Sequence, residues 1–132
     1  MTEVTLEHVN VTVADPPATA ARLCELFDWK IRWEGASKDA GYSVHVGGDA
    51  SYLALYAPAR PAGAQVVAKD GATYRTNGGL NHIAVTVDDI DAMEAKVKAA
   101  GYTPGNHADY EPGRRFYFFN EDGVEFEIVS YA

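Results

Sequence analysis

The chain has 132 residues, 47% of them hydrophobic, which is enough to bury a core as one domain or as two small halves sharing one. Its net charge of −8, without a cluster of Lys or Arg, argues against nucleic acid and anionic membranes as partners. The sequence contains no apolar run of ~20 residues and no signal-peptide pattern at its start, and Cys24 is the single cysteine. We therefore expect a cytoplasmic protein.

The first half of the chain predicts one β-α unit followed by three strands. Apolar and polar residues alternate from Val4 to Val13, as in a half-buried strand, and this places His8 on the polar face. Asp15 is suited to cap a helix that has Pro16 at its first position. Three strand-like runs separated by glycines follow, at Trp29 to Glu34, Tyr42 to Val46 and Ser51 to Tyr56.

The second half repeats this βαβββ order. A strand is predicted from Leu80 to Val87, and a helix capped by Asp88 or Asp89 ends at Gly101. The strand-like runs that follow are Tyr102 to Pro104, with an extension to His107 left open, Arg115 to Asn120, and Val124 to Tyr131.

The segment between the two halves is longer than most connections inside a compact domain. It is rich in Ala, Gly and Pro, and it could be a plain tether or a segment that covers a site. We therefore divide a single domain, residues 1–132, into module one (1–57), a connecting loop (58–78) and module two (79–132).

The most informative feature of the chain is a histidine at the same position of both halves. The ten residues that begin at Leu6 and the ten that begin at Leu80 are identical at six positions, and His8 and His82 are one of these matches. A single histidine on a strand is usually structural. A repeat that keeps the histidine in both copies indicates a site built from two related halves.

Strand parity adds a carboxylate to the two histidines. Matching the last predicted strand of each half aligns Ala54 with Glu127, and Glu127 then lies on the face that does not meet the helix, as His8 and His82 do. Two imidazoles and one carboxylate can hold a divalent cation and leave positions open for substrate. We therefore predict a metal site formed by His8, His82 and Glu127.

Other polar and aromatic residues are weaker candidates. By parity, Tyr52, Tyr56 and Tyr117 can line the cavity, although aromatic residues on strands commonly only pack. Asn10 and Thr12 could hold an imidazole or a substrate, or simply face solvent. His45 and His107 have no partner in the repeat and are expected at the surface or behind the site. For Arg114 and Arg115, which could bind an anionic substrate, a solvated hairpin end is favoured.

These features resemble the vicinal oxygen chelate superfamily, which includes glyoxalase I, extradiol dioxygenases, fosfomycin-resistance thiol transferases and bleomycin-resistance proteins. The sharpest matches are Leu80 to Val85 and Phe116 to Glu127, the latter similar to a family ending F-x-D-P-D-G-x-x-x-E, with Glu121 here in place of proline. The resemblance implies an α+β fold. In it, two βαβββ modules form a curved mixed sheet or half-barrel around a metal cavity, with the helices on the outer face.

The resemblance also implies a reaction class. Glyoxalase I takes a fourth ligand from the position that Ala54 occupies, so this chain keeps a three-ligand set of the kind that dioxygenases use with iron(II) and the thiol transferases with manganese(II). We expect a divalent-metal-dependent dioxygenase, lyase or transferase that acts on a small substrate with vicinal oxygens. Iron(II), manganese(II), nickel(II) and zinc(II) all remain open, and Tyr117 is the candidate general acid or substrate hydrogen-bond donor.

A second interpretation is a non-catalytic, bleomycin-resistance-like binding protein. Such proteins use the same fold as a cleft without metal, and the acidic charge would suit a cationic ligand. The resemblance further implies a homodimer, in which the modules pair within one chain or by exchange between two. The sequence leaves these arrangements open.

Overall fold

The computed structural model describes residues 4–59, 72–110 and 112–132. It divides the chain into two compact units, Met1–Gln65 and Val66–Ala132, and each unit has its own sheet and helix. Residues 60–71, the middle of the predicted connecting loop, lie outside the described residues. Of the described parts of that loop, residues 58–59 belong to the first unit and residues 72–78 to the second.

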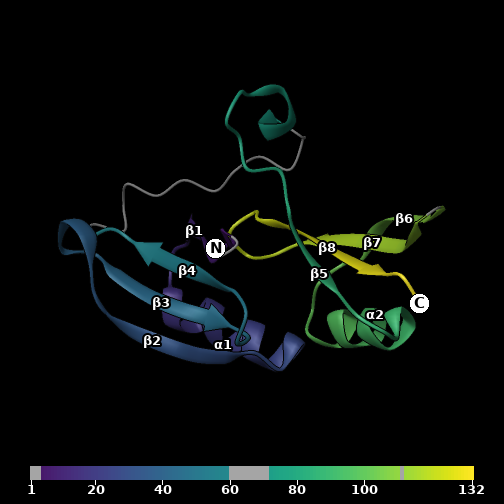
Figure 1. Ribbon diagram of the computed structural model, residues 1–132, viewed down its shortest axis with the longest axis horizontal. Helices are drawn as coiled ribbons and strands as arrows, with labels where there is room; N and C mark the ends of the chain where they lie inside the picture. The colour runs from purple at the N-terminus through teal and green to yellow at the C-terminus, as the bar shows by residue number, and fades with distance from the viewer. Residues whose placement is uncertain (1–3, 60–71, 111) are drawn as a thin grey trace. The chain divides into compact units, whose positions relative to one another are not determined.

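Unit 1 is a four-stranded mixed sheet with one α-helix (Figure 1). Its strands lie in the order β1-β4-β3-β2, with β1 parallel to β4 and the other pairs antiparallel. Its elements are β1 (His8–Thr12), α1 (Pro16–Phe27), β2 (Lys30–Ala36), the 3-10 turn η1 (Lys38–Ala40), β3 (Tyr42–Gly47) and β4 (Tyr52–Ala57).

Unit 2 repeats this topology, with strand order β5-β8-β7-β6 and β5 parallel to β8. Its elements are the 3-10 turn η3 (Ala72–Arg75), β5 (Ile83–Thr86), α2 (Ile90–Ala99), β6 (Gly105–Tyr110), β7 (Gly113–Phe119) and β8 (Glu125–Ser130). The predicted α+β class and the repeated βαβββ order are confirmed.

Two predicted strands of unit 2 have different bounds. The strand expected from Leu80 begins only at Ile83, so His82 directly precedes β5. The strand expected at 102–104 lies later, because β6 begins at Gly105, and it overlaps only the extension to His107 that the sequence left open. One cause is the end of α2, where Gly101 has φ of +97° and the Tyr102 N–H still donates a hydrogen bond to the Val97 carbonyl oxygen. A second cause is the proline at 104, which has no N–H to donate to a neighbouring strand.

Helix α1 begins and packs as its sequence predicts. The Asp15 side chain accepts a hydrogen bond from the Ala18 N–H at 3.1 Å, which satisfies one of the free donors of the first turn. The helix buries Ala20, Leu23 and Leu26, and Phe27 stays half-buried against Trp29. Leu26 therefore belongs to the buried core, and Phe27 lies at its margin.

Each sheet has one face toward its helix and a second face, which we call the open face. In unit 1, α1 packs on β3 and β4, where Val44, Val46 and Leu55 are fully buried. In unit 2, Phe126 and Ile128 are the corresponding buried residues of β8. Side chains of opposite parity on these strands belong to the open faces.

Gly47 is required where β3 turns toward β4. A Cβ atom there would overlap the Ser51 carbonyl oxygen and the Tyr52 backbone, whereas a Cβ at the adjacent Gly48 meets nothing within 4 Å. We expect Gly47→Ala to lower the free energy of unfolding by about 2 kcal/mol through steric strain, and Gly48→Ala to leave it nearly unchanged. Urea denaturation of the two variants measures the difference, and equal stabilities would contradict the packing at this turn.

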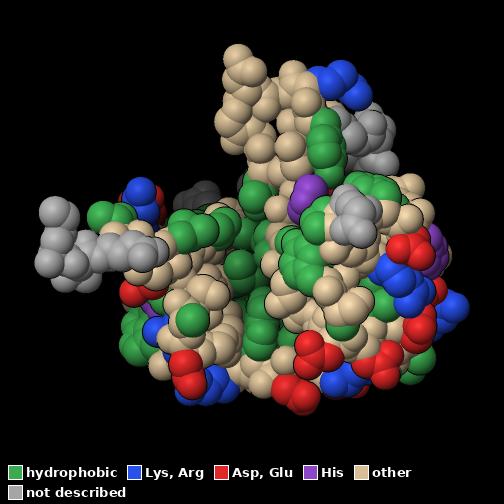
Figure 2. All heavy atoms as spheres, turned by 45° about the vertical axis from the view of Figure 1, so that its right-hand side comes forward, with side chains coloured by type: hydrophobic (Ala, Val, Ile, Leu, Met, Phe, Trp, Pro, Cys, Tyr) green, Lys and Arg blue, Asp and Glu red, His purple; other side chains and the backbone are tan. Residues whose placement is uncertain are grey.

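Neither helix is long and apolar enough to cross a membrane, among the residues described. The face shown in Figure 2 carries acidic and basic side chains close together and no continuous basic patch.

Candidate functional site

The open face of unit 2 brings together three of the predicted site residues. Glu127 in β8 is in register with Tyr117 in β7, and His82 lies just ahead of β5, which pairs with the other side of β8. The His82 Nε2 atom is 3.0 Å from Glu127 Oε1, and the Tyr117 ring lies edge-on to the imidazole with ring centres 5.5 Å apart. Glu127 is buried, with 6% of its surface exposed.

Tyr74, from the 3-10 turn η3, holds the other side of the His82 ring. Its hydroxyl oxygen is 2.9 Å from His82 Nδ1, and its hydroxyl donates to the buried Glu125 Oε1, also at 2.9 Å. The connecting segment therefore contributes a side chain to the site. No periodic pattern in the sequence indicates Tyr74, whereas Glu125 shares the strand parity of Glu127 and could have been found in that way.

The hydrogen atoms of this group fix how His82 faces Glu127. A tyrosine hydroxyl has one hydrogen, and Glu125 accepts it, so His82 Nδ1 must donate to the hydroxyl oxygen. In the neutral ring, Nε2 is then an acceptor directed at a carboxylate oxygen. Two acceptors 3.0 Å apart need a proton or a cation between them.

Arg115 lies on the other oxygen of Glu127. Its Nη1 donates to Glu127 Oε2 at 3.0 Å, 13% of its side chain is exposed, and its guanidinium lies 4.8 Å from the centre of the Tyr110 ring. The Arg115 Nε and Nη2 atoms are buried, and neither has a hydrogen-bond partner among the described residues. The expectation of a solvated hairpin end is wrong for Arg115, because its odd parity turns it onto the open face. The expectation holds for Arg114, which pairs with Asp91 at the surface.

His8 has a comparable arrangement on the open face of unit 1. Its Nδ1 is 2.8 Å from Glu7 Oε1, and the same carboxylate oxygen accepts a longer hydrogen bond, 3.3 Å, from the Tyr52 hydroxyl. The hydrogen bond to His8 and the proximity of its ring and of Arg32 lower the pKa of Glu7, which therefore stays ionised and favours a proton on Nδ1. Within the described part of the chain, His8 thus keeps Nε2 as its free nitrogen.

Each unit therefore orients its histidine with one tyrosine and one glutamate. In unit 1, the Glu7 carboxylate contacts the His8 ring, and the Tyr52 hydroxyl donates to that carboxylate. In unit 2, the Tyr74 hydroxyl contacts the His82 ring and donates to the Glu125 carboxylate. Hydrogen bonds of this kind from Nδ1 are typical of metal-binding histidines that coordinate through Nε2. His8 and His82 lie in different units, and the third-ligand role of His8 stays a prediction.

The other residues predicted for the cavity share the open face of unit 1. The β1–β4 register pairs His8 with Tyr52, Asn10 with Ala54 and Thr12 with Tyr56, all on this face. Ala54 is 2% exposed and offers no ligand atom. The Tyr56 hydroxyl donates to the Lys38 carbonyl oxygen, so its hydrogen serves the turn η1.

His45 and His107, which sequence reasoning put at the surface or behind the site, have ring contacts on their own sheets. His45 stacks on Tyr52 with ring centres 4.6 Å apart. His107 Nε2 is 2.9 Å from the Glu94 carboxylate on α2.

The donor set of unit 2 fits a divalent metal. Cis ligands that are each about 2.1 Å from a six-coordinate cation lie about 3.0 Å apart, the separation of His82 Nε2 and Glu127 Oε1. Imidazole and carboxylate together suit iron, manganese, nickel or zinc. Within the described part of each unit, no three His, Cys, Asp or Glu side chains are grouped as a complete site.

Two tyrosines of the site keep their protons at neutral pH. Burial and the nearby Glu127 charge raise the pKa of Tyr117, which can therefore act as a hydrogen-bond donor. Burial of its hydroxyl and the hydrogen bond to Glu125 raise the pKa of Tyr74 to about 12, from an ordinary value of 10.0.

The Tyr74 shift predicts a loss of stability in alkali. A pKa that is higher in the folded than in the unfolded chain stabilises the protein below about pH 10, and this contribution is lost as the pH rises toward about 12. Urea midpoints at pH 9 and pH 11.5 should therefore differ more in the wild type than in Tyr74→Phe. The difference between the two proteins removes the contribution of the other tyrosines to the change in urea midpoint. An identical pH dependence in both proteins would contradict the hydrogen bond to Glu125.

Comparisons with known proteins agree with the fold. The family model of the Glyoxalase/Bleomycin resistance protein/Dioxygenase superfamily matches residues 5–128. A glyoxylase/bleomycin resistance protein/dioxygenase domain from Frankia sp. EAN1pec superimposes with a TM-score of 0.77 at 20% identity, covering 98% of both chains. No curated protein matches the sequence.

Two further structures with this fold have named ligands or roles. A FosX variant from Listeria monocytogenes, in complex with Mn(II) and 1S,2S-dihydroxypropylphosphonic acid, has a TM-score of 0.71 at 19% identity, covering 97% of this chain and 93% of that one. TnmS3, an antibiotic-binding protein from Streptomyces sp. CB03234, has a TM-score of 0.73 at 16% identity, covering 100% and 99%. With the family model spanning almost the whole sequence, the resemblance to the vicinal oxygen chelate proteins is confirmed, and the chain belongs to the glyoxalase/bleomycin resistance protein/dioxygenase superfamily.

Proposed function

We propose that this chain is a divalent-metal-dependent enzyme acting on a small substrate that chelates the metal through neighbouring oxygens. The observation that carries the proposal is the orientation of His82, whose Nδ1 is held by the Tyr74–Glu125 pair while Nε2 faces Glu127 Oε1. His8, oriented through its own Nδ1 by Glu7, is the proposed third ligand. The Mn(II) complex of a FosX variant with the same fold supports the metal class.

A bound divalent cation would polarise a substrate oxygen and stabilise the negative charge that develops on it. Residues of unit 2 would orient the carboxylate ligand and supply a hydrogen-bond donor to the substrate. Arg115 holds the second oxygen of Glu127, which leaves Oε1 as the available donor atom. Tyr117, protonated and beside His82, can donate a hydrogen bond or a proton to the substrate.

The three-ligand set favours dioxygenase, lyase or transferase chemistry over that of glyoxalase I. Ala54 is buried on the open face of β4 and cannot replace the glutamate that glyoxalase I has at this position. We therefore expect no isomerase activity on hemithioacetals. Iron(II), manganese(II), nickel(II) and zinc(II) are the metals to test, and a homodimer stays a prediction from family resemblance.

Metal titration of the purified protein tests the proposal. Mn(II) binding, followed by electron paramagnetic resonance of the free ion and by calorimetry, should be weakened in His82→Ala and in His8→Ala. His107→Ala is the matched control, because this histidine contacts Glu94 away from the site, and it should bind as the wild type does. Equal binding of all four proteins, with each of the four metals, would exclude the proposed site.

A metal-independent binding protein is the second candidate. The open face of unit 1 exposes several aromatic rings, with 48% of Trp33 exposed, and an antibiotic-binding protein has the same fold. Ligand binding that persists with a chelator present and in Glu127→Ala would favour this function.

A further inference from the structure

We infer that the open face of unit 1 binds a flat aromatic molecule with a negative charge, which stacks on Trp33 and pairs with Arg32. This inference deepens the proposed function by naming a ligand class. It rests on that function only in so far as His8 shares the face. The site itself lies within unit 1 and needs no metal, so the two can fail separately.

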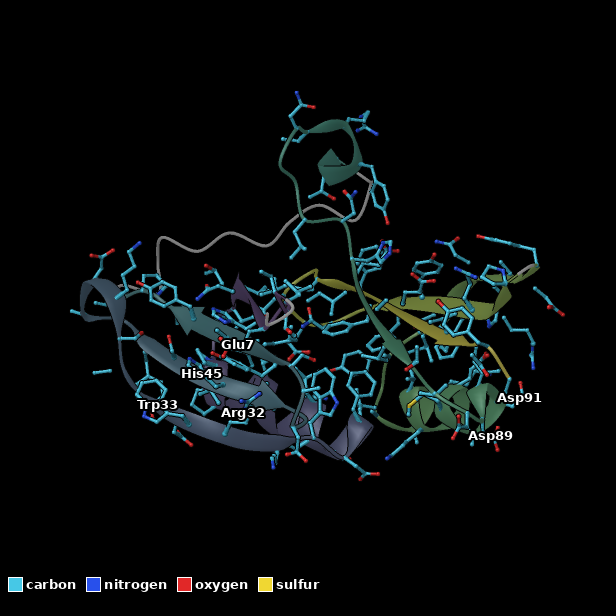
Figure 3. All side chains as sticks on the ribbon, in the orientation of Figure 1. Glu7, Arg32, Trp33, His45, Asp89 and Asp91 are labelled. Carbon is cyan, nitrogen blue, oxygen red and sulfur yellow. The ribbon has the colours of Figure 1, made fainter. Side chains whose placement is uncertain are left out.

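Four planar side chains, which we call the ring cluster, lie side by side across the four strands of unit 1. The ring centres of His8 and Tyr52 are 4.9 Å apart, those of Tyr52 and His45 are 4.6 Å apart, and those of His45 and Trp33 are 5.0 Å apart. Figure 3 shows Trp33 and His45 on neighbouring strands of this sheet. The rings support one another, which leaves a rigid surface with Trp33 at its edge.

The ring cluster is not a covered core. Trp33 is 48% exposed and the His8 side chain is 42% exposed, although both belong to a unit that buries its aliphatic residues on the helix side. Aromatic rings that gather at a surface usually mark a place where a ligand binds. An aromatic ligand would cover the exposed indole in an offset stack.

A β-bulge in β2 adds a cation to this face. The register shifts between Ile31, which pairs with Val46, and Trp33, which pairs with His45, and so Arg32 is the extra residue. Regular alternation would have turned Trp33 toward the helix; the bulge instead puts both Arg32 and Trp33 on the open face. The Arg32 guanidinium carbon lies 4.4 Å from the centre of the Tyr52 ring.

Arg32 has no carboxylate partner among the described residues. Its Nη1 donates to the Gly48 carbonyl oxygen at 3.3 Å. The two acidic groups nearby have their own donors, since His8 contacts Glu7 and Lys30 contacts Asp49. A guanidinium held over a ring with a neutral acceptor is suited to bind a carboxylate or a similar anion of the ligand. Arg32, Trp33, His45 and Glu7 all lie on this unit (Figure 3).

The test compares three probes on the full chain in the presence of EDTA. The probes are 2-naphthoate, which is flat and anionic, decalin-2-carboxylate, which is anionic but not flat, and 2-naphthylmethylammonium, which is flat and cationic. Calorimetry gives the dissociation constants. The indole N–H resonance of Trp33 reports the location, and Trp29→Phe assigns it because the chain has two tryptophans.

We expect 2-naphthoate to bind more tightly than the other two probes and to shift the Trp33 resonance. Trp33→Leu should weaken its binding about tenfold, and Arg32→Gln should remove the preference for the anion over the cation. Tyr42→Leu is the matched control, since Tyr42 is an exposed aromatic residue on the other face of β3, and it should bind as the wild type does.

Three outcomes would overturn the inference. One is an affinity for 2-naphthoate that is the same in Trp33→Leu as in the wild type. Another is equal affinity of the wild type for 2-naphthoate and decalin-2-carboxylate. The third is a wild type that sediments as a dimer through this face while Trp33→Leu is a monomer, because a second copy of the chain would then be the occupant. Naphthoate binding without metal binding would contradict the proposed enzyme alone, and metal binding without naphthoate binding would contradict this inference alone.

Discussion

Replacing Glu127 by alanine is expected to lower the free energy of unfolding by about 3 kcal/mol. The carboxylate is buried between two partners, Arg115 Nη1 and His82 Nε2, each at 3.0 Å. Its removal leaves the Arg115 guanidinium without its carboxylate acceptor. Two further nitrogen atoms of this group have no partner among the described residues, and only 13% of the side chain is exposed. Breaking a buried ion pair by removing one partner costs more than the pair itself contributes.

The chain offers a matched control in the preceding arginine. Arg114 pairs with Asp91 at 3.1 Å, but this pair is at the surface, with half or more of each side chain exposed. Asp91→Ala should therefore cost much less stability than Glu127→Ala. Urea denaturation of the metal-free protein measures both variants. The double variant Glu127→Leu/Arg115→Met should recover most of the loss, and equal costs for Glu127→Ala and Asp91→Ala would show that the Glu127 pair is not buried in solution.

Tyr74→Phe is expected to weaken Mn(II) binding by about 10- to 100-fold. Without the hydroxyl, His82 Nδ1 loses its acceptor and Glu125 loses its donor, so the imidazole is no longer fixed with Nε2 toward Glu127. The Tyr74 residue is 52% exposed, and the substitution removes only the hydroxyl, so little packing is lost. Metal affinity measured on the folded protein separates this effect from the loss of stability that removal of the hydroxyl also causes.

Tyr102→Phe is the control for this prediction. Tyr102 also donates from its hydroxyl to a glutamate of unit 2, Glu121 at 2.7 Å, but it contacts neither His82 nor Glu127 among the interactions described. Its variant should bind Mn(II) as the wild type does. Glu125→Gln, which can still accept a hydrogen bond, should lie between Tyr74→Phe and the wild type. The same affinity in all of these proteins would mean that the hydroxyl does not position the imidazole.

The sequence predicted the parts of the molecule that follow regular periods. Alternation along the strands was sufficient to place His8 on the open face of unit 1 and Glu127 on that of unit 2, and the repeat predicted the shared strand order. Tyr74 could not be found in this way, because a 3-10 turn in a connecting segment has no apolar period that shows where its side chains point.

The two arginines show a different limit. Arg32 and Trp33 share a face only because of a bulge, and a bulge breaks the very alternation from which faces are predicted. Arg115 was expected at a solvated hairpin end, yet its pairing with Val129 in the β7–β8 ladder places it beside Glu127. Where a pattern is interrupted, the partner strand decides the face, and the partner is not visible in a local stretch of sequence.

The strand order of each unit has a consequence for how its imidazole comes into position. His8 begins the first strand of unit 1 and pairs with Tyr52 in the last strand, while the intervening strands join neighbours along the chain. Contacts between distant parts of a chain form late, because the entropy of closing the loop must be overcome first. The nascent hairpins β2–β3–β4 can therefore assemble while His8 is still unordered, and the imidazole is fixed only when the unit closes. In a partly folded chain, His8, the proposed metal ligand, would therefore lack its place beside Tyr52.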